Sequence, residues 1–139
     1  MLDHLSKIEH IGIAVKNLDE SQKLFSALLG KDPYKLEKVE SEGVDTSFFQ
    51  IGGSKIELLK ATTHDSPIAG FIEKRGEGVH HIAFEVDDIE AEMDRLRNEG
   101  FQLLDESPRK GADNKLVCFI HPKSANGVLV ELCQDIRSK

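Results

Sequence analysis

The sequence predicts an α+β fold made of two tandem βαβββ modules, and internal similarity is the main observation behind that prediction. The stretch HIGIAVKNLDESQKLFSALLG begins at His10, and HIAFEVDDIEAEMDRLRNEG begins at His81. Both open with His-Ile, place a valine five residues after the histidine, and end on a glycine after a helical pattern. A repeat of this length indicates two similar structural units in succession.

Composition is that of an ordinary globular chain. Among 139 residues, 39% are hydrophobic and 31% are charged, and the formal net charge is −7. This acidic balance argues against nucleic acid as a partner, because neutralising phosphates requires a basic surface. No apolar run approaches the roughly 20 residues of a membrane helix. No secretory signal is recognisable, so we expect a cytoplasmic protein, not associated with membranes, in which Cys118 and Cys133 are reduced core thiols.

The strand and helix patterns define the two modules. Module one is expected over about residues 7–60, a linker over 61–77, and module two over about 78–134, within a single domain of residues 1–139. After its first strand and helix, each module carries three short apolar stretches that are typical of strands. These are YKLEKVES, TSFFQI and KIELL in module one, with a Gly52-Gly53 hairpin turn, and FQLLDE, KLVCFIH and VLVELC in module two. A short helix is expected in the linker around Ile68–Lys74.

One amphipathic helix is expected in each module. Asn17 and Asp88 stand where N-caps belong, and Gly30 and Gly100 stand where glycines end helices. Helical spacing then predicts the side that faces the core. That side comprises Leu18, Phe25 and Leu28 in the first helix, and Ile89, Met93 and Leu96 in the second.

The first strand of each module carries a histidine whose strand face is otherwise small. Residues two apart in a strand point to the same face, so His10 lies beside Gly12 and Ala14, and His81 lies beside Ala83. The opposite faces carry large apolar residues, which we expect to pack against a helix. Small residues leave open volume beside both histidines, as a ligand cavity requires.

The last strand of each module carries a glutamate between large aliphatic residues, Glu57 in IEL and Glu131 in VEL. Burying a carboxylate is costly unless a cation or a proton compensates its charge. Because the aliphatic neighbours are expected to face the helices, both glutamates should face the same side as the histidines. His10, Glu57, His81 and Glu131 then form an N2O2 set, which suits a divalent metal ion.

Only one histidine of the doublet His80-His81 fits this set. His81 is in repeat register with His10, 71 residues earlier, whereas His80 shares its face with Ile82 and Phe84. His80 is therefore expected on the helix side or at the sheet edge. A lone strand histidine is more often structural than a ligand, and we interpret His4, His64 and His121 in that way.

These motifs resemble the vicinal oxygen chelate superfamily, which includes glyoxalases, bleomycin resistance proteins and dioxygenases. The resemblance covers nearly the whole chain and depends on HIGIAV and HHIAFEVDDI at the module starts and IELL and VELC at the module ends. Within it, DSPIAGFIEKRGEGVHHIAFEV and HPKSANGVLVEL are similar to the methylmalonyl-CoA epimerase family. The resemblance implies one domain whose curved mixed sheet surrounds a metal cavity. It does not by itself assign a reaction, because one fold hosts many.

The epimerase resemblance implies a metal-dependent isomerase that interconverts the (R) and (S) C2 epimers of methylmalonyl-CoA, an acyl-CoA of propionate metabolism. It implies a divalent ion (Co, Zn, Ni, Mn or Mg) held by His10, Glu57, His81 and Glu131. Removing the C2 proton makes an enolate, and a divalent ion stabilises its negative charge as a Lewis acid. Family members are commonly homodimers, so a homodimer is expected.

Epimerisation needs a base on one face of C2 and an acid on the other. The resemblance implies Glu131 for one role and a glutamate shortly before a Gly-Val pair for the other. Here that segment reads VESEGVDTSFF, and Ser41 stands at the expected position, between Glu40 and Glu42. A bulge would turn Glu42 inward, so we predict Glu42 as the second base. The alternative is that Glu40 and Glu42 are plain loop charges.

Coenzyme A carries phosphates, so basic residues are expected near the rim of the cavity. The candidates for substrate binding lie in the SPRKGADNK and HPK loops, and they are Arg109, Lys110, Lys115 and Lys123. Each of them is also compatible with a solvated surface charge.

Two other functions stay open at this point. One is a lactoylglutathione lyase, because glyoxalase I uses a His/Glu/His/Glu set like this one, whereas epimerases often carry glutamine at the position of Glu57. The other is a non-catalytic protein of this fold that binds a small molecule. That second alternative predicts a missing ligand, yet all four are present in the sequence.

Overall fold

The computed structural model describes residues 4–136, which form helices and strands in the order that the α+β prediction requires. The chain divides into two compact units. One unit is His10–His80, and the other joins the residues up to Glu9 to those from His81 onward. The boundaries therefore fall inside the first strand of each repeat, next to each candidate metal ligand.

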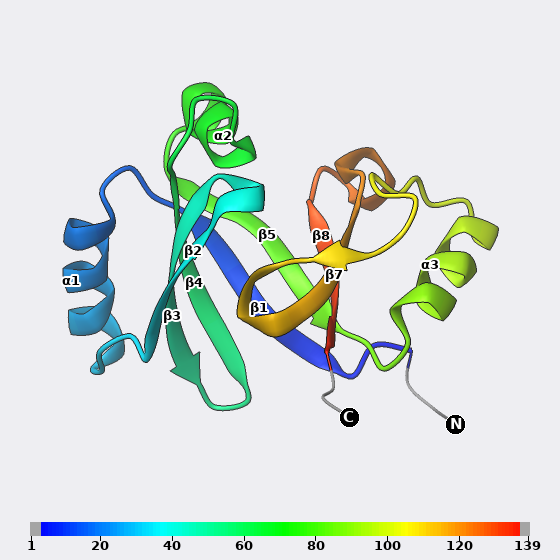
Figure 1. Ribbon diagram of the computed structural model, residues 1–139, viewed down its shortest axis with the longest axis horizontal. Coiled ribbons are helices and arrows are strands. Elements are labelled where there is room, and N and C mark those ends of the chain that lie inside the picture. The colour runs from blue at the N-terminus through cyan, green and yellow to red at the C-terminus, as the bar shows by residue number, and fades with distance from the viewer. Residues whose placement is uncertain (1–3, 137–139) are drawn as a thin grey trace. The chain divides into compact units, whose positions relative to one another are not determined.

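The first unit contains a four-stranded sheet with the order β2-β3-β4-β1 (Figure 1). Strands β1 and β4 are parallel, and the other neighbours are antiparallel. A 3-10 turn, Glu40–Glu42, joins β2 to β3. The elements are β1 (Lys7–Ala14), α1 (Leu18–Leu29), β2 (Lys35–Val39), β3 (Val44–Ile51), β4 (Ser54–Ala61) and α2 (Pro67–Arg75).

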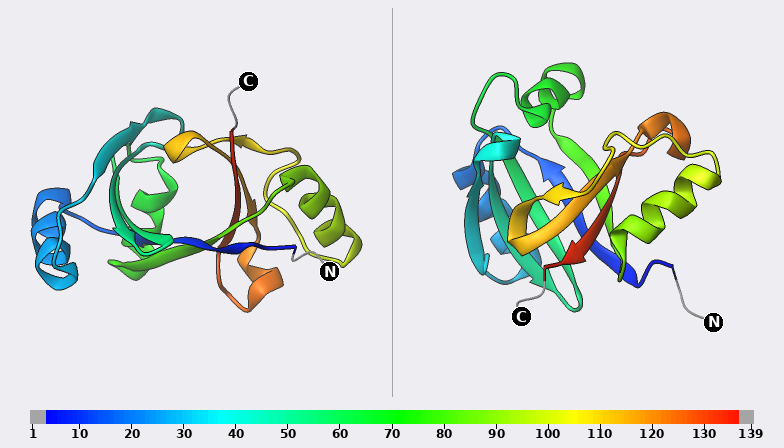
Figure 2. Two further views of the ribbon diagram at one scale, coloured as in Figure 1. Left: turned by 90° about the horizontal axis from the view of Figure 1, so that it is seen from below. Right: turned by 45° about the vertical axis from the view of Figure 1, so that its right-hand side comes forward.

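Helix α1 packs on one face of this sheet (Figure 2). The apolar layer between them includes Leu18, Phe49 and Leu58, each less than 9% exposed. Ile56 packs in the same layer, so the prediction that the aliphatic neighbours of Glu57 face the helix is confirmed. The prediction for Leu28 was wrong, because that side chain is 69% exposed and Leu29 packs against the core in its place.

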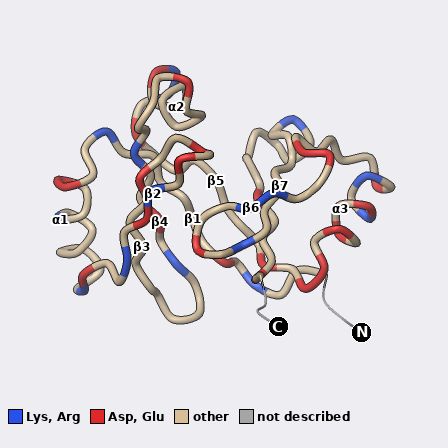
Figure 3. The backbone as a smooth tube through the Cα atoms, viewed as in Figure 1, with Lys and Arg blue, Asp and Glu red and all other residues tan. Residues whose placement is uncertain are grey.

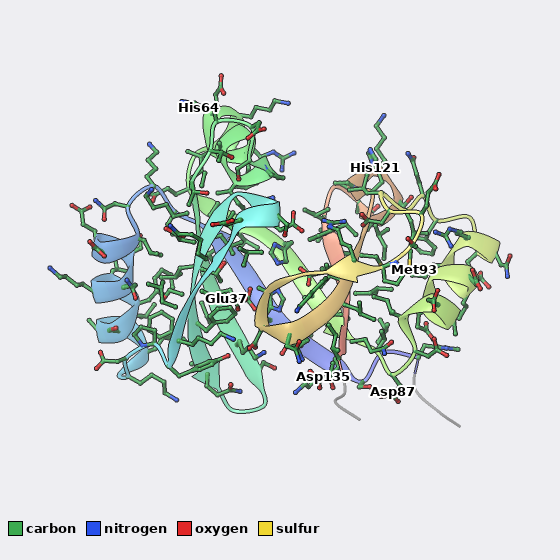
Figure 4. The ribbon with its side chains drawn as sticks, viewed as in Figure 1. Glu37, His64, Asp87, Met93, His121 and Asp135 are labelled. Carbon is green, nitrogen blue, oxygen red and sulfur yellow. The ribbon has the colours of Figure 1, made fainter. Side chains whose placement is uncertain are left out.

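The second unit repeats this plan with the strand order β5-β8-β7-β6. Strands β5 and β8 are parallel, and β7 is antiparallel to both of its neighbours. Met93 of α3, labelled in Figure 4, lies in a core with Ile89, Leu96 and Leu132, as the helical spacing predicted. The elements are β5 (Gly78–Glu85), α3 (Ile89–Asn98), β6 (Arg109–Lys110), β7 (Lys115–Ile120) and β8 (Val130–Asp135), with 3-10 turns at Ala112–Asn114 and Pro122–Ala125.

The predicted helix caps are confirmed at both N-termini. The Asn17 side chain accepts a hydrogen bond from the backbone N–H of Glu20 at 3.0 Å, and Asp88 accepts one from Ala91 at 3.1 Å. Such caps satisfy N–H groups that have no partner inside the helix. Gly30 ends α1 in the left-handed conformation, whereas the C-cap of α3 is Glu99, one residue before the predicted Gly100.

The expected strand at FQLLDE was wrong. Of its residues only Leu103 makes a β-bridge, to Ile120, and the edge strand is the two-residue β6. The side chain of Asp105 replaces a backbone partner, because it accepts a hydrogen bond from the N–H of Phe119 at 2.8 Å. A charged residue that turns inward in this way interrupts the strand ladder.

Both cysteines are buried and unpaired with each other, as predicted for core thiols. Burial raises the pKa of the Cys118 thiol to about 12, and the negative charges of Asp105 and Glu131 act in the same direction. The thiol therefore stays protonated and unreactive at neutral pH. In the described part of the chain, no helix combines the length and the apolar character needed to cross a membrane.

Gly43 fixes the turn between β2 and β3 to the segment before α2. Its φ is +63°, and its carbonyl accepts a hydrogen bond from the N–H of Thr62 at 2.8 Å. A Cβ at this position would lie 2.7 Å from Thr63 Oγ1 and 3.1 Å from Ser66 Cβ. Both the backbone angle and the packing therefore require glycine.

We expect Gly43→Ala to lower the free energy of unfolding by about 2 kcal/mol, because a left-handed residue with a Cβ costs about 1–2 kcal/mol before any clash. Urea denaturation measures the change. Gly53→Ala is the matched control, since nothing lies within 4 Å of its added Cβ. Equal stability of the two variants would contradict this view of the turn.

Candidate functional site

In the first unit, the structure brings His10 and Glu57 together. The parallel register of β1 and β4 places Gly12 opposite Glu57, and places His10, two residues earlier on the same face, opposite Lys55. His10 Nδ1 and Glu57 Oε2 are 3.1 Å apart, and both residues are at most 5% exposed. Because Gly12 has no side chain, the carboxylate and the imidazole occupy this face of the two strands together.

The second unit contains an equivalent pair. Ala83 of β5 lies opposite Glu131 of β8, and His81 precedes Ala83 by two residues on the same face. His81 Nε2 and Glu131 Oε1 are 3.1 Å apart, again in almost completely buried surroundings. The ring of Phe119 meets the His81 ring edge-on, with centroids 5.8 Å apart. This contact restricts the rotation of the imidazole.

The spacing within each pair fits metal coordination. Two ligand atoms that each lie about 2.1 Å from one ion would be about 3.0 Å apart at a right angle and about 3.4 Å apart at the tetrahedral angle. The observed 3.1 Å in both pairs lies within that range. It is also the length of an ordinary hydrogen bond from a histidine to a carboxylate. In either case a buried carboxylate is compensated, and imidazole nitrogen with carboxylate oxygen is a donor set suited to zinc and similar ions.

The remaining histidines have other partners. The ring of His80 packs edge-on against Phe71 of α2, with centroids 5.1 Å apart, which agrees with a structural role. His4 Nδ1 lies 3.1 Å from Glu92, and His121 accepts a hydrogen bond from the N–H of Lys123 at 3.0 Å. His64 is exposed, in the loop before α2 (Figure 4).

The predicted second base lies in a turn and not in a β-bulge. Glu40, Ser41 and Glu42 form the 3-10 turn that Gly43 ends. Glu40 and Ser41 are exposed, whereas Glu42 is half-buried. Of the three, Glu42 thus has the side chain best shielded from solvent. The turn begins directly after the last pair of β2 and β3, which joins Val39 to Val44.

Three of the four predicted basic residues are exposed. Arg109 and Lys110 form β6, where Figure 3 shows positive charge, and Lys123 lies in the turn after β7. Arg109 forms an ion pair with Asp105, and its guanidinium lies over the ring of Phe119, 5.4 Å from the centroid. Because Phe119 also touches His81, Arg109 is one side chain away from a candidate metal ligand.

Lys115 differs from the other three, because its side chain is only 9% exposed. Its Nζ lies 2.5 Å from Asp135 and 3.8 Å from both Glu9 and Glu85. Asp135, labelled in Figure 4, closes this cluster at the end of β8. Lys115 is thus surrounded by carboxylates, which explains why it is buried and makes it a poor ligand for a phosphate at a rim.

Glu37 and Thr46, which lie on the same sheet face as Glu57, could not be selected from sequence patterns. Register pairs Glu37 with Thr46 across β2 and β3, and pairs Phe48 with Glu57 across β3 and β4. Glu37 alternates with exposed residues in an edge strand, so its pattern is that of a solvated charge. Only the strand register identifies its face.

The chain matches the family model of the glyoxalase/bleomycin resistance protein/dioxygenase superfamily over residues 9–119. The chain belongs to this superfamily. Membership agrees with the order of elements in each unit and with the equivalent His–Glu pairs. The fold predicted from the repeat is confirmed.

Relatives within the superfamily include several epimerases. The ethylmalonyl-CoA/methylmalonyl-CoA epimerase of Cereibacter sphaeroides is 40% identical over 94% of this chain and 98% of that protein. The human mitochondrial methylmalonyl-CoA epimerase is 39% identical over 94% of this chain and 75% of that protein. The uncharacterised protein YqjC of Bacillus subtilis is similarly close, at 41% identity over 94% of this chain and 93% of that protein.

Solved structures give the same picture. Methylmalonyl-CoA epimerase from Mycobacterium tuberculosis superposes with a TM-score of 0.93 at 33% identity, covering 99% of this chain and 94% of that one. A variant of the Streptomyces coelicolor enzyme in complex with 2-nitronate-propionyl-CoA gives a TM-score of 0.92 at 36% identity, covering 96% and 99%. The suspected relationship to methylmalonyl-CoA epimerases is therefore confirmed.

We expect Lys115→Met to lower the free energy of unfolding by about 3 kcal/mol at neutral pH. The substitution keeps an unbranched side chain of similar length but removes the ammonium group that lies 3.8 Å from the buried carboxylate of Glu9. Chemical denaturation measures the loss. Lys110→Met is the control, because the exposed Lys110 should tolerate the same change within about 0.5 kcal/mol. A Lys115 variant as stable as this control would mean that the cluster is not held by its lysine.

Proposed function

We propose that this protein is a methylmalonyl-CoA epimerase, which interconverts the two C2 epimers by removing and returning one proton. The observation that carries the proposal is the pair of equivalent buried His–Glu contacts at 3.1 Å, in a chain 39–42% identical to several epimerases of this kind. The reaction needs stabilisation of an enolate, and such a donor set provides it when it holds a divalent ion.

His10, Glu57, His81 and Glu131 are the proposed ligands of one divalent ion. When bound, the ion supplies a Lewis acid for the negative charge that develops on the substrate. The repeat supports this set, because each unit contributes one imidazole and one carboxylate from matching strands. Within each unit, the histidine and the glutamate already lie at ligand spacing.

The protein side chains are left with two tasks. Glu131 is proposed to exchange a proton with C2 from one side, and a second carboxyl group must act from the other side. Arg109, Lys110 and Lys123 are exposed and cationic, which suits contact with the phosphates of coenzyme A. Lys115 is not included, because its carboxylate partners already surround its ammonium group.

A second candidate is a lactoylglutathione lyase. Glu57 favours it, because the His/Glu/His/Glu set resembles that of glyoxalase I. Both reactions begin with proton removal beside a carbonyl, so the metal set alone does not separate them. Substrate preference does.

We expect the metal-loaded protein to incorporate deuterium at C2 when it is incubated with methylmalonyl-CoA in D2O. Mass spectrometry measures the incorporation, and separation of the epimers measures their interconversion. Absence of both exchange and interconversion would overturn the epimerase proposal. Isomerisation of the hemithioacetal of glutathione, with methylmalonyl-CoA left unchanged, would assign the protein to the lyase alternative.

We expect His81→Ala to abolish stoichiometric binding of a divalent ion, because it removes one of four ligands. His80→Gln is the matched control at the neighbouring position, whose ring packs on Phe71 and is not a proposed ligand. Calorimetric titration of each protein with Zn²⁺ or Co²⁺ measures stoichiometry and affinity. Equal loss in both variants would indicate general destabilisation, and unchanged binding in His81→Ala would remove it from the ligand set.

A further inference from the structure

Glu37 lies on the metal-ligand face of the first unit. It is paired with Thr46 of β3, while Phe48 two residues later in β3 is paired with Glu57 of β4. Residues paired across strands share a face, as do residues two apart in one strand. Glu37 and Glu57 therefore point to the same side of the sheet. This side is opposite to the helix-covered layer that contains Phe49 and Leu58.

The separation of these two carboxylates suits a substrate that lies between them. They are two strands apart, which is about 10 Å. Along the strand direction they are two residues apart, which is about 7 Å. Their Cα atoms are thus about 12 Å apart on a flat sheet. A group bound beside Glu57 on this face has Glu37 on the same side of the sheet.

Glu42 is less well placed. Its turn is followed by Val44, the first residue of β3 on this face. Val44 is four residues, or about 13 Å, from Phe48 along β3. The Glu42 side chain begins beyond that point, at the end of the sheet. Glu37 lies in β2 before this turn begins. Its partner Thr46 is two residues closer to Phe48 than Val44 is.

The surroundings of Glu37 leave its carboxylate accessible to a ligand and held by a neighbouring cation. Its side chain is 32% exposed, so a ligand can reach it, and Lys35 Nζ lies 3.3 Å from its Oε1. The same ammonium group lies over the ring of Phe48, 5.0 Å from the centroid. Lys35 thus holds the Glu37 side chain against this face of the sheet. Figure 4 labels Glu37 on β2.

Thr46 supplies an independent observation. Its side chain is 0% exposed, and no residue of the described range 4–136 provides its Oγ1 with a hydrogen-bond partner. An unsatisfied buried hydroxyl costs free energy, so its retention requires a reason. Its strand partner is Glu37, and paired Cβ atoms are about 5 Å apart. The Glu37 carboxylate is therefore an acceptor within side-chain range of this hydroxyl.

The repeat gives Glu37 a counterpart of opposite charge. Phe48 and Phe119 are paired with Glu57 and Glu131 in the same way, and Thr46 and Val117 precede those phenylalanines by two residues. The edge-strand partner of Thr46 is Glu37, and that of Val117 is Arg109. Module one thus presents a carboxylate where module two presents a guanidinium.

We propose that Glu37, and not Glu42, is the second acid–base group of this site, a proposal that rests on the epimerase function above. On one face of C2, a carboxylate takes the proton as the C–H bond breaks, and its electron pair forms the enolate. On the other face, the protonated second carboxyl group returns a proton to C2 and becomes a carboxylate again. No oxidant or reductant takes part. Arg109 is left to bind an anionic group of the substrate.

The test compares Glu37→Gln with Glu42→Gln in the metal-loaded protein, using each epimer of methylmalonyl-CoA separately in D2O. A two-base site that loses one base no longer interconverts the epimers. It still exchanges the C2 proton of the epimer that faces the remaining base. We expect Glu37→Gln to lose interconversion by about 10²–10⁴-fold, the usual contribution of such a group, and to retain exchange with one epimer only. We expect Glu42→Gln to stay within about threefold of wild type.

Lys35→Met separates chemistry from structure, because it removes the same ion pair but keeps the Glu37 carboxylate. It should interconvert the epimers at least about tenfold faster than Glu37→Gln. The proposal is overturned if Glu37→Gln interconverts the epimers within about threefold of wild type, or if Lys35→Met is equally impaired. Failure of the wild-type protein to exchange either epimer would instead overturn the epimerase function itself. Thermal melting and metal content verify that all variants are folded and loaded.

Discussion

The need to compensate one buried carboxylate in each unit determines most of this structure. Glu57 and Glu131 lie in strands whose other faces are covered by helices, and each is at most 6% exposed. Neither position is tolerable without an adjacent positive charge, hydrogen-bond donor or metal ion. The histidine at 3.1 Å meets that need, and the small residues at Gly12 and Ala83 leave room for it. The repeat therefore preserves an electrostatic arrangement together with a fold.

Further along the second unit, Lys115 compensates another buried carboxylate, that of Glu9, with an ammonium group. The pair of Val117 and Cys133 lies between the row of Glu131 and the row of Lys115, and with Ala83 it forms an apolar layer. This layer keeps the ammonium group with Asp135, Glu85 and Glu9 and away from the His81–Glu131 pair. A lysine cannot ligate a metal while it is protonated. This charge cluster therefore stabilises the unit without competing with the His81–Glu131 pair for the proposed ion.

The repeat, the helix caps and the His–Glu contacts could be predicted because they depend on local patterns. Alternation along a strand identifies faces, and Asn17 and Asp88 carry out a capping chemistry that short sequences reveal. The errors arose where tertiary contacts override pattern. Leu28 has helical spacing but no sheet beneath it, and Asp105 turns inward to the N–H of Phe119 and ends an expected strand. Glu37 could not be selected, because its face depends on which strands become neighbours.

In the proposed epimerase, the two edge strands explain how a symmetric set of ligands can serve an asymmetric reaction. In the proposed set, two glutamates offset the charge of a divalent ion, whereas a glutamine in place of Glu57 would leave one positive charge in excess. With two glutamates, the proposed acyl-CoA substrate therefore needs another cation for its negative charge, and the edge strand of module two carries Arg109, which pairs with Asp105 and lies over Phe119. The edge of module one offers Glu37 at the matching position. In this proposal, duplication of the module supplies the two His–Glu pairs. Divergence of the edge strands supplies Arg109 for binding and Glu37 for proton transfer.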